Sequence, residues 1–235
     1  MNLLAARGLT VRFGGLTALD GVDLTVRHGE VVGVMGPNGA GKSTLFEALS
    51  GRVRLASGSI LFDGHDITRW PPHRRARAGM GRTFQEGRLL EQLTARNHLD
   101  VSLAWRPDRR VDEYLDLLEV LDVPPDVPVS DLPLAARRAV NIARALALDP
   151  LILLLDEPAA GLSEQETVEF ARALWVLKQA ADLTLVLVEH DVDLVLGLAD
   201  FVYVLDAGRV IAEGAPDDVR SDAAVIDAYL GVARA

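Results

Sequence analysis

The sequence of 235 residues contains no cysteine, so no disulfide framework holds the fold and the cytosol is the expected compartment. Its longest apolar stretches, such as Leu151–Leu155 and Leu183–Val188, are far shorter than the roughly 20 residues that a membrane-spanning helix needs. The N-terminus lacks the charged segment, apolar core and small-residue cleavage site of an export signal. We therefore expect a chain that does not cross a membrane and is not exported.

Positive charge is also scarce. The 24 Lys and Arg against 34 Asp and Glu give a formal net charge of −10 at pH 7, which argues against a general affinity for nucleic acid. One basic cluster departs from this composition, and we interpret it as the solvated face of a helix that leads into a strand, not as a binding patch. The cluster consists of His73, Arg74, Arg75, Arg77 and Arg82.

Hydrophobic residues make up 49% of the chain, as in a folded globular protein, and the length suits one α/β domain with a small appended subdomain. Alternating residues near the N-terminus predict antiparallel strands, which form a β layer. Further along, nearly all-apolar strands alternate with helices, which predicts a mainly parallel sheet covered on both faces. The predicted strands are 9–13, 22–26, 30–35, 59–62, 151–155, 184–188 and a hairpin of 201–205 with 209–212; the predicted helices are one from Pro71-Pro72 to near Gly79, a helical region over 88–121, and helices over 135–148, 163–180 and 192–198.

The most informative stretch of the sequence is Gly36–Thr44, which fits G-x-x-x-x-G-K-[ST] between a predicted strand and a predicted helix. In that context the glycines let backbone N–H groups curl round a phosphate at the positive end of a helix dipole. Lys42 would reach the β- and γ-phosphates and Ser43 would ligate Mg²⁺. The alternative, a glycine-rich turn that binds nothing, is disfavoured by the flanking elements. The predicted nucleotide-binding residues of this loop are Gly36, Pro37, Asn38, Gly39, Ala40, Gly41, Lys42, Ser43 and Thr44.

Two adjacent carboxylates, Asp156 and Glu157, follow the apolar strand 151–155. Ligand sites in such sheets lie at the carboxyl ends of strands. Asp156 could hold Mg²⁺ there, directly or through water, and Glu157 could polarise an attacking water. The alternative role for the pair is an N-cap of the following helix.

Three further residues are candidates by position. Gln85 follows a strand-like segment and could touch Mg²⁺ or the water, although an isolated Gln is more often a surface residue. His190 follows the strand 184–188 and could contact the γ-phosphate, although a lone His is more often a surface or capping residue. Phe13 precedes a Gly-Gly turn and could stack on a nucleobase, although an isolated aromatic is more often part of the core.

Taken in order and spacing, Phe13, the loop 36–44, Gln85, the segment 156–158 and His190 closely resemble the ATP-binding cassette of ABC transporters, over essentially the whole chain. Finer stretches are similar to the cassettes that power import of branched-chain amino acids, urea and related small amides. These stretches are 12–15, 72–85, 156–162, 189–191 and 226–231.

The resemblance implies a P-loop NTPase core of the RecA type over 1–86 and 136–235, with an antiparallel β layer and an inserted helical signature subdomain over 87–135. It implies an ATPase whose substrate is ATP, with Lys42, Glu157 and His190 in catalysis, Phe13 and Gln85 at the nucleotide, and Ser43, Gln85 and Asp156 at Mg²⁺. Such a subunit lies on the inner face of the cell membrane. It docks on transmembrane permease subunits, pairs with a second cassette and works indirectly with a solute-binding protein.

The sequence departs from the family at the signature Leu-Ser-Gly-Gly-Gln, which falls on Leu132–Ala136. Pro133 offers no N–H and Ala135 adds a methyl group where a glycine lets the backbone approach a phosphate. Ser163 stands where the family often has Asp or Asn. We therefore expect a heterodimer with a cassette that carries a proper signature.

Two alternative functions remain open on the sequence. A soluble cassette protein acting on ribosomes or DNA usually carries two cassettes or a long coiled-coil insertion, and neither is present. A regulatory cassette that does not hydrolyse ATP is disfavoured by the intact Glu157 and His190.

Overall fold

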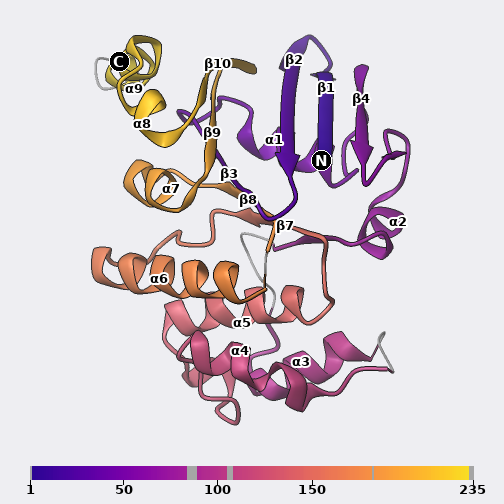
Figure 1. Ribbon diagram of the computed structural model, residues 1–235, viewed down its shortest axis with the longest axis vertical. Coiled ribbons are helices and arrows are strands. Elements are labelled where there is room, and N and C mark those ends of the chain that lie inside the picture. Colours follow the sequence, from indigo (N-terminus) through magenta and orange to yellow (C-terminus); the bar gives the residue numbers. More distant parts are fainter. Residues whose placement is uncertain (1, 84–88, 105–107, 182, 233–235) are drawn as a thin grey trace.

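The computed structural model describes residues 2–83, 89–104, 108–181 and 183–232 and contains two β-sheets (Figure 1). The strands are β1 (Asn2–Phe13), β2 (Leu16–Arg27), β3 (Val31–Met35), β4 (Ser57–Phe62), β5 (His65–Asp66), β6 (Met80–Arg82), β7 (Ile152–Asp156), β8 (Leu185–Val188), β9 (Phe201–Asp206) and β10 (Arg209–Gly214). A four-stranded antiparallel sheet has the order β2-β1-β4-β5, and a six-stranded sheet has the order β10-β9-β3-β8-β7-β6. In the larger sheet all neighbours are parallel except the hairpin of β9 and β10. The predicted α/β class, with a separate antiparallel layer, is confirmed.

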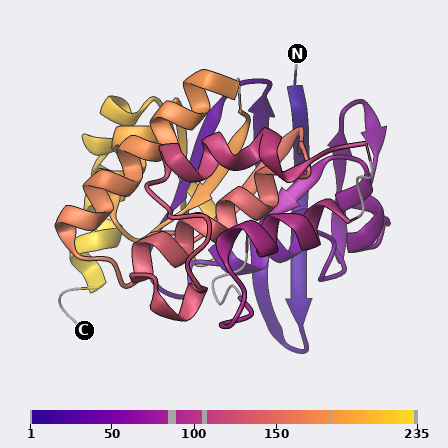
Figure 2. The ribbon, with the colours of Figure 1, turned by 90° about the horizontal axis from the view of Figure 1, so that it is seen from below.

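Helices lie on both sides of the larger sheet, and the view from below in Figure 2 shows the side formed by the helices from the middle of the chain. None of the helices within the described ranges is long and apolar enough to span a bilayer. The α-helices are α1 (Lys42–Leu49), α2 (Pro72–Arg77), α3 (Ala95–Leu103), α4 (Leu115–Val120), α5 (Leu134–Leu146), α6 (Glu164–Ala181), α7 (Val192–Leu198), α8 (Pro216–Arg220) and α9 (Ala223–Val232), and two short 3-10 turns are η1 (Val111–Tyr114) and η2 (Val129–Asp131).

The larger sheet separates two hydrophobic cores because successive side chains of a strand point to opposite faces. Val32 and Leu154 belong to the core shared with α1 and the antiparallel sheet, whereas Val31 and Leu155 belong to the core shared with α5, α6 and α7. Every residue of β3, β7 and β8 is buried. This two-sided burial explains why these strands are apolar without alternation.

The helical region predicted over 88–121 is shorter and more broken in the structure. α3 begins at a capping box formed by Thr94 and Asn97 and ends at Leu103. Arg110 has an extended backbone, so the amphipathic stretch that follows starts as the 3-10 turn η1 and becomes helical only in α4. The prediction of one helical region was therefore correct in type and wrong in continuity.

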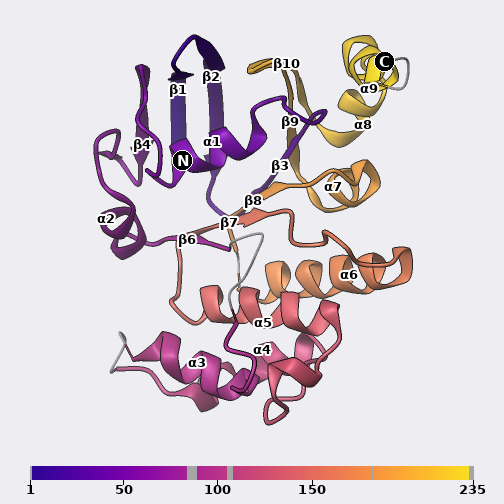
Figure 3. The ribbon, with the colours of Figure 1, turned by 180° about the vertical axis from the view of Figure 1, so that it is seen from behind.

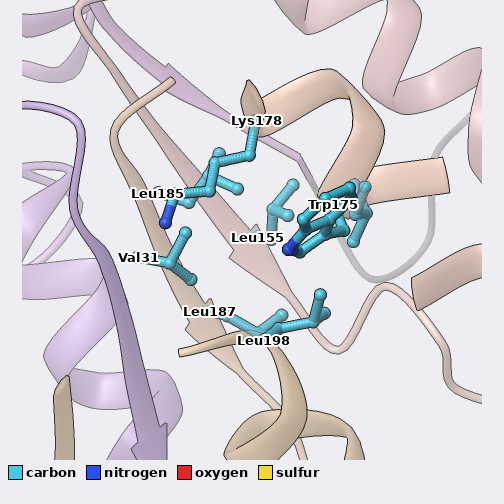
Figure 4. A pocket seen from close by; sticks show the side chains of 8 residues that line it. Val31, Leu155, Trp175, Lys178, Leu185, Leu187 and Leu198 are labelled. Carbon is cyan, nitrogen blue, oxygen red and sulfur yellow. The ribbon is translucent and has the colours of Figure 1, made fainter. Parts of the chain in front are cut away.

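A small apolar pocket lies under α6, on the face of the sheet away from α1 (Figure 4). The ammonium of Lys178, one of its lining residues, forms an ion pair of 2.7 Å with Asp200. The other lining side chains offer no group suited to a phosphate, so we assign the pocket to the packing of α6 on the sheet. It is lined by Val31, Leu155, Leu174, Trp175, Lys178, Leu185, Leu187 and Leu198.

Candidate functional site

Four neighbouring parallel strands, β3, β8, β7 and β6, end at the same edge of the larger sheet. The loops that leave them carry most of the residues singled out in the sequence: the phosphate loop after β3, His190 after β8, and Asp156 and Glu157 at the end of β7. Gln85 follows β6 and lies outside the described residues. The carboxyl edge of a parallel sheet is where such folds bind their ligands.

The phosphate loop has the backbone geometry that its glycines allow. Gly36 and Gly41 have φ angles of +146° and +106°. A Cβ atom on Gly36 would lie 2.1 Å from the carbonyl oxygen of Leu205, and one on Gly41 would lie 2.7 Å from that of Ala18. These two positions therefore require glycine for the space as well as for the angle. The loop leads directly into α1, so N–H groups and a helix dipole meet at one point.

Lys42 folds back over the loop that precedes it. Its ammonium donates hydrogen bonds to the carbonyl oxygens of Gly36 at 2.6 Å and Pro37 at 2.9 Å. Burial lowers the pKa of Lys42, and the nearby carboxylate of Glu157 opposes that shift. A phosphate would give this ammonium a stronger acceptor than either carbonyl.

Asp156 is 7% exposed and pairs with Arg82, whose Nη2 lies 2.8 Å from its Oδ2 atom. Arg82 also donates to the Oγ atom of Ser50 at 2.6 Å, at the C-terminal end of α1. One guanidinium therefore joins the helix that begins at the phosphate loop to the carboxylate at the end of β7. Asp156 and the exposed Ser43 are oxygen ligands of the kind that Mg²⁺ takes.

Within the described ranges, no group of three or more acidic or histidine side chains could hold a metal ion. Separately from that absence, Ser43 and Asp156 offer oxygen atoms of the kind that Mg²⁺ takes when phosphates and water complete its coordination.

Glu157 and His190 meet across the ends of β7 and β8. The Nε2 atom of His190 lies 2.7 Å from the Oε1 atom of Glu157, and the N–H of Glu157 donates to the carbonyl of Val188. Glu157 has a φ of +46°, a left-handed conformation that costs energy for a residue with a side chain. α6 begins well beyond this pair, at Glu164, so the alternative in which these carboxylates cap the following helix is wrong.

Glu189 was not a candidate in the sequence, although it directly follows the apolar strand β8, at the same sheet edge where Asp156 ends β7. It is 4% exposed, and its carboxylate accepts hydrogen bonds from the N–H groups of Ala159 and His190. Burial raises its pKa, the two hydrogen bonds oppose the shift, and the nearby Glu157 adds to it. A carboxylate placed directly before His190 was the signal available in the sequence.

The basic cluster differs from its predicted solvated face. Arg75 is 2% exposed and donates to the carbonyls of Ala48 and Leu49 at the end of α1, and burial lowers its pKa to about 10. Arg82 is partly buried, with 11% of its side chain exposed, and pairs with Asp156, whereas His73, Arg74 and Arg77 are exposed on α2 beside β6 (Figure 3). The prediction holds for these three side chains and is wrong for the two guanidiniums that find carbonyl and carboxylate partners inside the fold.

Phe13 and the first residues of α5 are accessible at the surface, whereas Leu132 and Ala136, the ends of the segment 132–136, are buried. Phe13 is 49% exposed at the tip of the β1–β2 hairpin, which disfavours the alternative that it is a core residue. Pro133 precedes α5, and Leu134, its first residue, is 42% exposed. One turn further, Arg138 donates to the carbonyl of Ala160 at 3.0 Å and so ties α5 to the loop after Glu157.

Known proteins agree with this geometry. A family model described as ABC transporter matches residues 19–160, and one described as branched-chain amino acid ATP-binding cassette transporter matches 209–235. The chain is 37% identical to the high-affinity branched-chain amino acid transport ATP-binding protein BraF of Pseudomonas aeruginosa and 36% identical to the corresponding LivG of Escherichia coli, with 98% of both chains covered in each case.

Solved structures give the same result. The fold matches an ATP-binding cassette of an ABC transporter in its ADP conformation with a TM-score of 0.88 and 30% identity, covering 98% of this chain and 99% of that one. A nucleotide-free cassette matches with a TM-score of 0.85 at 30% identity, covering 97% and 99%. The chain belongs to the ABC transporter family, as one of its ATP-binding cassettes, the subunits that hydrolyse ATP to drive transport.

Proposed function

We propose that this cassette drives an importer of branched-chain or other hydrophobic amino acids, or of urea-like amides. The observation that carries the proposal is the meeting of the phosphate loop, Asp156 and the Glu157–His190 pair at one sheet edge. The substrate class comes from BraF and LivG, which are named as branched-chain amino acid transport proteins, and from the family match over 209–235.

In this proposal each residue has a separate role. The N–H groups of the loop 36–44 and the ammonium of Lys42 hold the phosphates of ATP. Glu157 accepts a proton from the attacking water while His190 holds its carboxylate and contacts the γ-phosphate. Phe13 stacks on the base.

Mg²⁺, when bound, neutralises charge on the phosphates, and we propose Ser43, Asp156 and Gln85 as the residues that hold it. The fit rests on Ser43 and Asp156, because Gln85 lies outside the described residues. Asp156 keeps its orientation through the ion pair with Arg82.

The proposed assembly contains permease subunits, a second cassette and, indirectly, a solute-binding protein, with this chain peripheral on the inner face of the membrane. We propose a heterodimer because Leu132–Ala136 lacks the serine hydroxyl and glycines that would complete a partner's site. We propose a core of 1–86 and 136–235 and a helical subdomain of 87–135, so that Leu132–Ala136 lies at the border between the two. Full ATP turnover by a homodimer of this chain would overturn the heterodimer.

Glu157→Gln tests hydrolysis because the amide cannot accept the water's proton. We expect the assembled transporter with this variant to lose turnover and to retain ATP instead of ADP after gel filtration. Glu119→Gln, an exposed change of the same type on α4, is the matched control. Unchanged turnover and nucleotide retention in Glu157→Gln would favour a regulatory cassette and overturn the proposal.

A further inference from the structure

Glu189 connects two loops of the site through a single carboxylate. Its Oε1 atom accepts the N–H of Ala159 at 2.7 Å, and its Oε2 atom accepts the N–H of His190 at 3.1 Å. Ala159 belongs to the loop after β7 and His190 to the loop after β8. Each carboxylate oxygen therefore holds the backbone of a different loop.

The chemistry of the two partners requires a carboxylate at this place. Both are N–H donors, and only an ionised carboxylate presents acceptors on both of its terminal atoms. A glutamine would present one oxygen and one NH₂ group, and the NH₂ group would face an N–H. The shorter aspartate would lack the reach to span both loops. At 4% exposure, an N–H left without its acceptor finds little water to replace it.

The same two loops carry the Glu157–His190 pair. Ala159 lies two residues beyond Glu157, whose left-handed backbone has to be held by its surroundings. The loop is fixed on its other side by Arg138, which donates to the carbonyl of Ala160 at 3.0 Å. Glu189 thus supplies the connection from this braced loop to the backbone of His190.

We propose that Glu189 is a positioning residue for ATP hydrolysis, whose carboxylate clamps the loops after β7 and β8 at Ala159 and His190 and so sets the distance between Glu157 and His190. This inference rests on the proposed roles of Glu157 and His190. It assigns no contact with ATP to Glu189, so its loss should lower kcat and leave KM for ATP almost unchanged.

The experiment compares Glu189→Gln and Glu189→Ala with the exposed control Glu119→Gln. In the isolated full chain, the amide protons of Ala159 and His190 should be shifted downfield by their carboxylate acceptor in NMR spectra. Glu189→Gln should remove one of these shifts and Glu189→Ala both. In the assembled transporter, Glu189→Ala should lower kcat on the order of 100-fold, which is the effect of misplacing catalytic groups by about 1 Å. The kcat of Glu189→Gln should lie between that of Glu189→Ala and that of the control Glu119→Gln.

A double-mutant cycle separates positioning from simple support of the fold. In the Glu157→Gln background, Glu189→Ala should cost little further turnover, because the pair that it positions is already disabled. A lower melting temperature with unchanged kcat in Glu189→Ala would overturn the positioning role. So would an equal kcat loss in both backgrounds, or amide shifts that survive the substitution. If Glu157→Gln itself keeps full turnover, the proposed function fails, and the positioning role fails with it.

Discussion

Replacing Arg82 should destabilise the chain strongly, because Arg82 neutralises the carboxylate of Asp156 in a buried place. The two side chains are 11% and 9% exposed, and the pair spans 2.8 Å. Arg82→Met keeps most of the apolar stem and leaves the carboxylate without its ion-pair partner. Removing one partner of a buried ion pair costs about 3–5 kcal/mol. For a chain of this length, about 2–4 °C of melting temperature per kcal/mol gives a fall of roughly 6–20 °C.

Thermal unfolding of the nucleotide-free chain in a chelating buffer measures this fall. The matched control is Arg209→Met, which breaks an exposed pair with Asp20 and should cost about 0–1 kcal/mol. Adding Asp156→Asn to Arg82→Met removes the uncompensated charge and should recover most of the lost stability. A melting temperature within the range of the Arg209→Met control, or no recovery in the double variant, would refute the electrostatic reasoning.

Three further predictions follow from the same geometry. Gly36→Ala should abolish ATP binding measured by calorimetry, because its Cβ would lie 2.1 Å from the carbonyl oxygen of Leu205. In the control Gly39→Ala, the added Cβ meets no atom within 4 Å, so this variant should cost only about 1–2 kcal/mol of backbone strain. Phe13→Ala should weaken ATP binding by about 1–3 kcal/mol and leave tripolyphosphate binding unchanged; equal losses for both ligands would exclude stacking on the base. The pKa of Glu189 is raised in the folded chain, so the folded chain binds more protons than the unfolded chain between the ordinary carboxyl pKa and the raised value. The free energy of unfolding should therefore fall as pH rises through this window. Denaturant unfolding at a series of pH values should show a shallower fall for Glu189→Gln.

The features that could be predicted from the sequence are those that depend on residues close together in the chain. The phosphate loop was recognisable because its strand, glycines and helix are contiguous, and β7 and β8 because burial on both faces makes them continuously apolar. The apolar periodicity did not predict where the helical region over 88–121 is interrupted: α3 ends at Leu103, and Arg110 has an extended backbone before η1.

The burial and the hydrogen-bond partners of Arg75 and Arg82 could not be predicted, because these partners are distant in sequence. Arg75 reaches carbonyls of α1, and Arg82 reaches Asp156, which follows it by 74 residues. A guanidinium on a short amphipathic segment has the same local pattern whether it faces water or the end of another helix. The tertiary fold decides which, and it also brings Ala159 to the carboxylate of Glu189.

The strand order has a consequence for synthesis of the chain. β8 lies between β3 and β7, yet it is the last of the three to leave the ribosome. Until residues 185–188 have been made, the phosphate loop and the carboxylates of β7 have no shared sheet to bring them together. A nascent chain that ends before β8 therefore has no assembled site through which ATP could stabilise it, and the edges of β3 and β7 that pair with β8 lack their partner. We therefore expect the sheet edge that holds the site, and with it the affinity for ATP, to form when β8 inserts between β3 and β7. In the presence of ATP, chains arrested just after this strand should resist protease much better than chains arrested just before it.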